Sequence, residues 1–270
     1  MEYPYSFKSL VPEAYNKYVV MNIRPEEEFF FLDVLGALYK YTESDSLSSR
    51  NLVLQSLRNG KNVVPDYIKV TDVNAYAYDQ RGIPKNYLED ISEDVDDNDA
   101  SVIVTPPAPF DEYKFKDLRS IVGFDFRWHI RRSALGYFKD KFSKYDYHVI
   151  GIDVSCFNDK TCKAVFSHLD KAVCSNVNSR LLLTNTWNCR HVDLLLDRYR
   201  DRVHFRTCSN IDDPLYRCCV DLSMLYMCDA CLVCESNFSS FSRVYNSRDM
   251  FYYYVDNDSC FEELLISEEE

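Results

Sequence analysis

The chain has 270 residues, 46% of them hydrophobic and 15% aromatic, so it can bury one large core or two ordinary ones. Its formal net charge is -12 at pH 7 and its sequence pI is about 4.9. Because polyanion affinity comes largely from Lys and Arg, this balance argues against nucleic acid or an anionic membrane as a partner. No membrane span or signal peptide is recognisable, which predicts a soluble cytoplasmic protein, or one of the ER or Golgi lumen if a leader has been trimmed.

All 11 cysteines lie between Cys156 and Cys260, an odd number that a disulfide scaffold would not readily explain. The run "CDACLVC" at 228–234 has two overlapping C-x-x-C spacings, but no second compact Cys or His pair completes a metal site. The same run is typical of a buried strand in which Cys serves as a small apolar residue. We therefore expect mostly free thiols and no metal.

The first part of the chain has a strand, helix, strand pattern. Residues 17–23 ("KYVVMNI") and 50–56 ("RNLVLQS") predict strands, and 29–41 ("FFFLDVLGALYKY") predicts a helix from its apolar spacing. Such a unit favours parallel pairing of its two strands. Residues 89–99 hold seven carboxylates in eleven positions and predict a solvated loop, and 105–109 ("TPPAP") predicts an extended connection.

The second part alternates more regularly and predicts an α/β fold with a doubly wound parallel sheet, whose ligands bind beyond the carboxyl ends of the strands. We place a domain boundary before Trp128, with one domain over 1–127 and a second over 128–270. The predicted strands are 148–155, 180–185, 203–206 and 230–234, and the predicted helices are 128–142, 161–174, 191–199, 219–227 and one beginning near Ser240.

Three serines follow the last of these strands in "NFSSFSRVYNSRD". Ser239, Ser240 and Ser242 are hydroxyl residues near a predicted helix start, where unpaired backbone N–H groups and the helix dipole favour an anion such as phosphate. By spacing alone, the favoured interpretation is that these serines only cap a helix. Their place beyond the carboxyl end of a sheet strand favours phosphate binding.

Residues 220–250 resemble the carboxyl-terminal motif of the protein O-fucosyltransferases and their relatives. The runs "LLLTNTW" and "DRVHFR" stand where that family has two further strands, although Asn185 replaces the usual Asp, and 17–56 looks like the family's first strand, helix and second strand. The motif elements present in order are Asp221-Leu222, Cys228-Asp229, Ser239-Ser240-Phe241-Ser242 and Arg248-Asp249.

The resemblance implies two Rossmann-like domains facing across a cleft, as in GT-B glycosyltransferases, with a GDP-sugar held mainly by the carboxyl-terminal domain. By position, Asp221 would bind the nucleoside. The serine motif, Ser239, Ser240 and Phe241 with the adjoining Ser242, would hold the pyrophosphate. The alternative for Asp221 is a plain helix cap.

Two departures bear on catalysis. The family's central strand ends in a His-x-Arg motif whose Arg stabilises the leaving pyrophosphate, but here Asp153 and Ser155 take those places and only the following Asp159 is kept. Loss of that cation should slow transfer about 100-fold or more unless another cation enters. The family's Gly-rich first loop is replaced at 24–28 by "RPEEE", whose carboxylates we expect to favour the start of the next helix.

These observations predict an inverting glycosyltransferase that moves a fucose-like sugar from a nucleotide-sugar donor, GDP-linked, to a hydroxyl of a glycan or glycoprotein acceptor. Asp153 or Asp159 would be the base, and Arg24 or Arg131 would stabilise the diphosphate. The donor is a substrate, so no cofactor is expected. The alternatives are a catalytically inactive binding or interaction protein that kept the fold, and an α/β protein that resembles the family by chance. The sequence does not identify the sugar, the acceptor or the oligomeric state.

Overall fold

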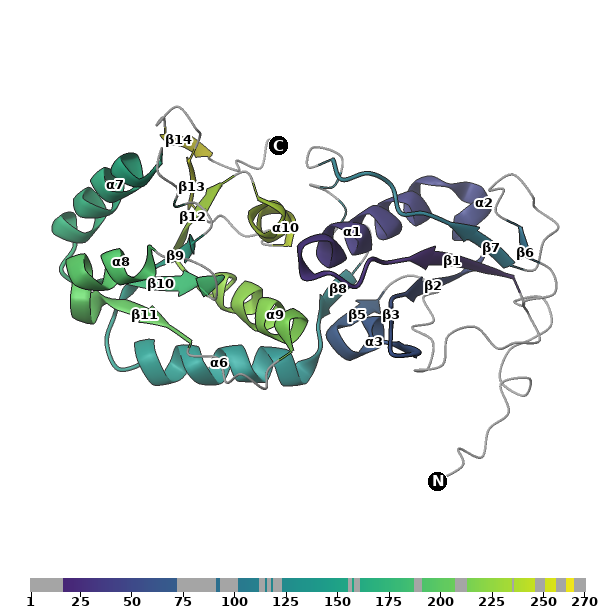
Figure 1. Ribbon diagram of the computed structural model, residues 1–270, viewed down its shortest axis with the longest axis horizontal. Coiled ribbons are helices and arrows are strands. Elements are labelled where there is room, and N and C mark those ends of the chain that lie inside the picture. The colour runs from purple at the N-terminus through teal and green to yellow at the C-terminus, as the bar shows by residue number, and fades with distance from the viewer. Residues whose placement is uncertain are drawn as a thin grey trace, which may run out of the picture. The chain divides into compact units, whose positions relative to one another are not determined.

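The computed structural model describes residues 17–71, 91–92, 102–111, 115, 118, 123–154, 157, 161–186, 191–206, 213–234, 236–245, 251–255 and 261–264. By its internal contacts the chain divides into two compact units, Met1–Arg127 and Trp128–Glu270. Both are α/β units built on mainly parallel sheets (Figure 1). Within the described ranges, every helix is too short or too polar to cross a membrane.

The first unit is built on a four-stranded parallel sheet in the order β2-β1-β7-β6. The predicted parallel pairing of its first two strands is confirmed. The loop predicted over 89–99 is wrong at Ile91–Ser92, because these two residues pair with β7 as an edge strand. The sheet strands are β1 (Tyr18–Asn22), β2 (Asn51–Gln55), β6 (Ile91–Ser92) and β7 (Val102–Thr105).

Helix α1 (Glu27–Glu43) connects β1 to β2 and buries most of its length, including Phe30 and Leu35. Glu27 and Glu28 lie in its first turn, where the helix dipole favours carboxylates. At Gly36 the helix touches the "TPPAP" segment: Ala108 donates its backbone N–H to the Gly36 carbonyl at 3.2 Å. A Cβ on Gly36 would lie 2.1 Å from the Ala108 carbonyl oxygen, so only glycine fits there.

Smaller elements complete the first unit. Hairpin β3–β4 turns through two residues of positive φ, Asn59 (52°) and Gly60 (75°), which is the turn chemistry that a two-residue hairpin favours. A separate antiparallel pair joins β5 to β8. The bounds are α2 (Asp45–Ser48), β3 (Leu57–Arg58), β4 (Lys61–Asn62), α3 (Val64–Tyr67), β5 (Ile68–Thr71) and β8 (Gly123–Phe126).

The second unit is built on a six-stranded sheet in the order β11-β10-β9-β12-β13-β14. Numbered along the chain, this is the doubly wound order 3-2-1-4-5-6, with the change of direction between β9 and β12. All pairs are parallel except β13 with β14. The strands are β9 (His148–Asp153), β10 (Ser179–Thr184), β11 (Val203–Phe205), β12 (Ala230–Cys234), β13 (Phe251–Val255) and β14 (Phe261–Leu264).

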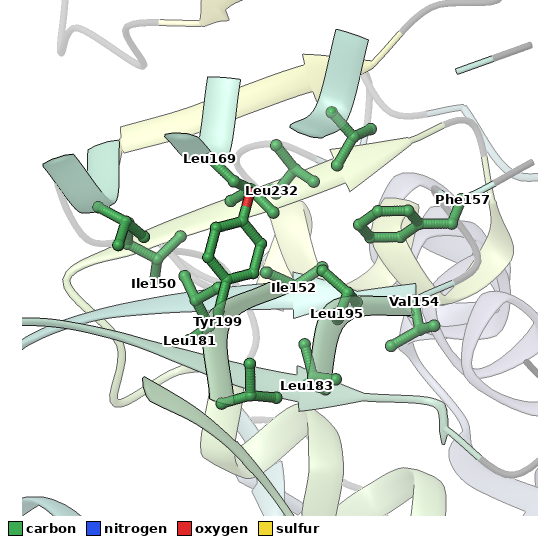
Figure 2. Close-up of a cluster of buried hydrophobic side chains, with 13 residues drawn as sticks. Ile150, Ile152, Val154, Phe157, Leu169, Leu181, Leu183, Leu195, Tyr199 and Leu232 are labelled. Carbon is green, nitrogen blue, oxygen red and sulfur yellow. The ribbon is translucent and has the colours of Figure 1, made fainter. Parts of the chain in front are cut away.

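Helices cover both faces of this sheet (Figure 1). On one face, alternate strand residues such as Ile150 and Ile152 form an apolar core with side chains of α7 and α8, among them Leu169 and Leu195 (Figure 2). On the other face, α9 packs against β9 and β10, and α6 packs against α9. The helices are α6 (Trp128–Phe142), α7 (Cys162–Ser175), α8 (Val192–Tyr199), α9 (Pro214–Leu225) and α10 (Asn237–Tyr245), with the 3-10 turn η6 (Arg200–Arg202) after α8.

Two predicted helix starts are wrong. Helix α9 begins at Pro214 and not near residue 219, because Asp213 caps it by accepting the N–H of Leu215 at 2.7 Å and Pro214 occupies the first turn. Helix α10 begins at Asn237, three residues before Ser240. Asp221 therefore lies in the body of α9, and the interpretation of Asp221 as a plain helix cap is wrong.

The sheet also has two strands that the sequence analysis did not include, β13 and β14. The aromatic run "FYYYV" of β13 is typical of a strand and could have been recognised from its β propensity. It continues the parallel sheet beyond β12, so the α10 helix connects two neighbouring parallel strands.

The Gly36 contact gives a stability prediction with an internal control. Gly36→Ala should lower the free energy of unfolding by about 1 to 3 kcal/mol, because the new methyl group meets a backbone carbonyl that cannot move alone. Gly136→Ala, in α6 with nothing within 4 Å of the new Cβ, should raise it by about 0.5 to 1 kcal/mol. Urea unfolding followed by circular dichroism measures both, and equal effects of the two changes would contradict the close approach.

Candidate functional site at the carboxyl edge of the second sheet

Polar side chains gather where β9, β10 and β12 end. Strands β9 and β12 are neighbours at the change of direction of the sheet, where doubly wound folds leave a crevice for ligands. Asp153 is the last residue of β9, Thr184 the last of β10 and Cys234 the last of β12. The candidate site is the group of side chains that surrounds these three strand ends.

Asp153 is completely buried, with 0% exposure, and it is held by several donors. Its Oδ2 accepts hydrogen bonds from the hydroxyls of Ser236 at 2.8 Å and Ser239 at 2.6 Å. Its Oδ1 accepts from the Asn185 side-chain amide at 3.3 Å. A buried carboxylate needs such donors because it has lost its hydration. Here they come from the end of β10 and from the start of α10.

The start of α10 is organised around the same carboxylate. The Ser236 hydroxyl caps the helix by accepting the Ser239 N–H at 3.0 Å while it donates to Asp153. The Ser239 hydroxyl also accepts the Cys234 N–H, at 3.2 Å. Helix starts favour an anion, and here the anion is a side chain of the protein itself.

Asn185 connects two buried carboxyl groups. It has a positive φ of 60°, a left-handed conformation that Asn tolerates better than most residues. Its backbone N–H donates to Asp221 Oδ2 at 2.9 Å, and its side-chain amide donates to Asp153. The sequence analysis treated Asn185 only as a departure from the family pattern; an Asn directly after a buried strand is the signal that could have identified it.

Asp221 reaches this edge from the middle of α9 and is only 4% exposed. Burial raises its pKa to about 7, although the Asn185 N–H and the cations Arg206 and Arg217 oppose the rise. The Arg206 Nε lies 4.0 Å from Asp221 Oδ1. Tyr137 lies on α6, and its pKa is raised to about 12, mainly by burial and then by the negative charge of Asp221. Asp221 therefore changes charge near neutral pH in a buried environment that holds charges of both signs. The sequence analysis did not identify Arg206 or Arg217.

The remaining residues of the serine motif divide between site and core. Phe241 is fully buried and stacks on Tyr245, with ring centroids 5.7 Å apart. Ser242 is 1% exposed, and Ser240 is partly exposed and donates its N–H to the Ser236 carbonyl at 2.8 Å. Among these motif residues, Ser239 donates its hydroxyl to Asp153 at 2.6 Å.

Arg24 lies in the first unit and is held by Asp33. Its Nε and Nη2 donate to the two carboxylate oxygens of Asp33 at 2.8 and 2.7 Å, and its guanidinium lies 4.0 Å from the centre of the Phe29 ring. Its charge is thus already paired within its own unit. Arg131 is exposed on α6. Asp159 and the Arg248-Asp249 pair lie outside the described residues.

The C-x-x-C run is part of the sheet and of the turn before it. The Cys228 thiol donates to the Met224 carbonyl at 3.5 Å and the Cys231 thiol to the Leu225 carbonyl at 3.7 Å. Burial raises the pKa of the Cys228 thiol well above its ordinary value. Among the residues that the structure describes, no three His, Cys, Asp or Glu side chains are grouped as a metal site would require.

The fold is similar to that of solved fucosyltransferases. NodZ α-1,6-fucosyltransferase co-crystallized with GDP matches with a TM-score of 0.60 at 13% identity, over 91% of this chain and 97% of that chain. A mutant of Arabidopsis thaliana FUT1 in complex with GDP matches with a TM-score of 0.53 at 12% identity, over 92% and 72%. POFUT1 in complex with GDP-fucose matches with a TM-score of 0.51 at 11% identity, over 89% and 98%. No protein-family model and no curated protein matches the sequence.

The raised pKa of Asp221 makes stability depend on pH. The pKa of Asp221 is about 7 in the folded protein and near the ordinary value of 3.8 in the unfolded chain. The proton therefore stabilises the folded state fully below pH 3.8, and this stabilisation is lost as the pH rises to 7. Relative to Asp221→Asn, the wild type should lose about 2 to 3 kcal/mol of unfolding free energy between pH 5 and 8.

Urea unfolding at several pH values measures this difference. The control is Asp140→Asn, because Asp140 is an exposed carboxyl on α6 whose pKa is lowered by Lys141 and which stays ionised over this range. Parallel stability curves for the wild type and Asp221→Asn would show that Asp221 is an ordinary carboxyl.

Ser239 and Ser240 should differ in their effect on stability. Ser239→Ala removes a buried hydroxyl that joins Asp153 to the Cys234 N–H and should lower the unfolding free energy by about 1 to 3 kcal/mol. Ser240→Ala, one position along α10 and partly exposed, should change it by less than about 0.5 kcal/mol. Thermal and urea unfolding compare the two variants, and equal losses would argue against the Asp153 contact.

Proposed function

We propose that this chain is a fucosyltransferase-like glycosyltransferase that takes a sugar from a nucleotide-sugar donor, with GDP as the nucleotide, and passes it to a hydroxyl of a glycan or protein. The observation that carries the proposal is the network of Asp153, Asn185 and Asp221 at the carboxyl ends of β9 and β10. Asp153, at the end of β9, borders the change of direction between β9 and β12, and doubly wound sheets bind nucleotides beside such a point. Support also comes from the fold, because the similar structures include complexes with GDP and GDP-fucose.

In this proposal the second unit, 128–270, binds the donor and the first unit, 1–127, serves the acceptor. Asp221 accepts hydrogen bonds from nucleoside N–H or hydroxyl groups, which its partly charged carboxyl suits. Arg206 and Arg217, which act on Asp221 electrostatically, supply positive charge toward the diphosphate in place of the arginine missing from the β9 end. Ser240, at the partly exposed side of the α10 start, is a further donor to the diphosphate.

The base that deprotonates the acceptor is a separate assignment. Asp153 is fully buried and its oxygens accept bonds from Ser236, Ser239 and Asn185, so it would have to lose these partners to reach an acceptor hydroxyl. We therefore assign Asp153 a positioning role, and Asp159 remains the predicted base. Inversion at the sugar follows only if that base and the leaving diphosphate lie on opposite sides of the sugar.

Binding and turnover can be tested in one series. GDP at 100 times its dissociation constant should stabilise the wild type by about 2.7 kcal/mol, and GDP-fucose or another GDP-sugar should be hydrolysed slowly without an acceptor. Asp221→Asn should weaken GDP binding, whereas Asp140→Asn, an exposed change of the same charge, should not. Thermal unfolding and release of free sugar are the measurements. Absence of both GDP stabilisation and donor hydrolysis would refute the proposal.

The second candidate function is a binding or interaction protein that kept the fold without transfer. The observation that favours it is the Asp153 carboxylate itself, which takes the hydroxyl donors at the start of α10. Stabilisation by GDP with no hydrolysis or transfer from any GDP-sugar tested would support a nucleotide-binding protein of this kind. Neither stabilisation nor hydrolysis would favour a protein whose ligand is not a nucleotide.

A further inference from the structure

We propose that Asp153 determines the ligand specificity of this edge by acting as an internal anion: its carboxylate occupies the start of α10 and weakens the binding of a diphosphate there. The inference rests on the proposed function insofar as the diphosphate belongs to the donor. It assigns to Asp153 a role in selecting between ligands with and without phosphate charge.

Four hydrogen-bond donors at the start of α10 already have partners within the protein. A serine hydroxyl carries a single proton, and the protons of Ser236 and Ser239 both point to Asp153 Oδ2, at 2.8 and 2.6 Å. The backbone N–H of Ser239 donates to the Ser236 hydroxyl, and the N–H of Ser240 to the Ser236 carbonyl. A phosphate that approached these groups would have to take donors away from the carboxylate.

Electrostatic repulsion also weakens the binding of a phosphate at this position. A phosphate beside the Asp153 carboxylate would face a like charge in a place without solvent, since Asp153 has 0% exposure. Asp153 and Asp221 already repel each other electrostatically, with Asn185 donating to both. From β12 and the turn after it, the Cys234 thiol, at 4.0 Å, and the two serine hydroxyls face Asp153.

The carboxylate is also fixed in place. Its partners come from the end of β10 and from the turn and helix that follow β12, so it cannot turn away without breaking bonds to each of them. A purely structural Asp153 and an internal anion predict different results. Removing a structural residue lowers stability and leaves the choice of ligand unchanged, whereas removing the internal anion raises affinity for phosphate.

The test compares wild type with Asp153→Asn, which keeps the shape and an acceptor oxygen but removes the charge. Calorimetric titration uses three probes: inorganic pyrophosphate, GDP and guanosine. Pyrophosphate and GDP should bind Asp153→Asn about tenfold or more tightly than wild type, a change of about 1.4 kcal/mol, and guanosine should bind both alike. Asp140→Asn, an exposed loss of the same charge, should match wild type for all three probes.

Equal pyrophosphate affinity for wild type and Asp153→Asn, including no binding to either, would overturn the inference. If Asp153→Asn does not fold, Asp153→Ser removes the carboxylate and leaves a smaller side chain, and the same comparison applies. The proposed function fails separately: it is rejected if neither protein binds GDP or guanosine, even where Asp153→Asn binds pyrophosphate. An affinity gain for guanosine as large as for GDP would show that Asp153 blocks the site by shape and would also overturn the inference.

Discussion

The second unit depends on the burial of one carboxylate at the end of β9. Asp153 has no exposed surface, and a carboxylate without water is stable only where hydrogen-bond donors surround it. Those donors are Asn185 after β10 and Ser236 and Ser239 at the start of α10. Satisfying Asp153 therefore fixes the ends of neighbouring strands and the entry into α10, and this is also the edge at which a doubly wound sheet binds its ligand.

The side chains at this edge, and not the fold, decide what the site can bind. Its backbone is similar to that of structures of NodZ, FUT1 and POFUT1, at 11 to 13% identity. A fold supports many chemistries, and the side chains of the site decide among them. Here two buried carboxyl groups, Asp153 and Asp221, share Asn185, while Arg206 lies beside the second of them. Any ligand of this edge must match that distribution of charge.

Much of the architecture was predictable because it depends on local patterns. The apolar periodicity of 29–41 predicted helix α1. The run "ACLVC" predicted strand β12 with the bounds that the structure has. The predicted start of α9 was five residues late. The Asp213-Pro214 pair, an N-cap followed by Pro in the first turn, is the sequence signal for the observed start. The two-residue strand β6 could not be predicted, since its strand character comes from pairing with β7.

The sequence by itself determined the alternation of strands and helices from β9 to α10 and the presence of polar residues just beyond those strands, because both follow from periodicity and from residue types. Only the tertiary structure decided which polar groups meet. Ser236 and Ser239 are 83 and 86 residues from Asp153, and the parallel register of β9 with β12 is what brings them together. The serines that sequence assigned to a phosphate are thereby divided between an internal carboxylate, the core and the surface. That division depends on packing across the sheet, which no local pattern encodes.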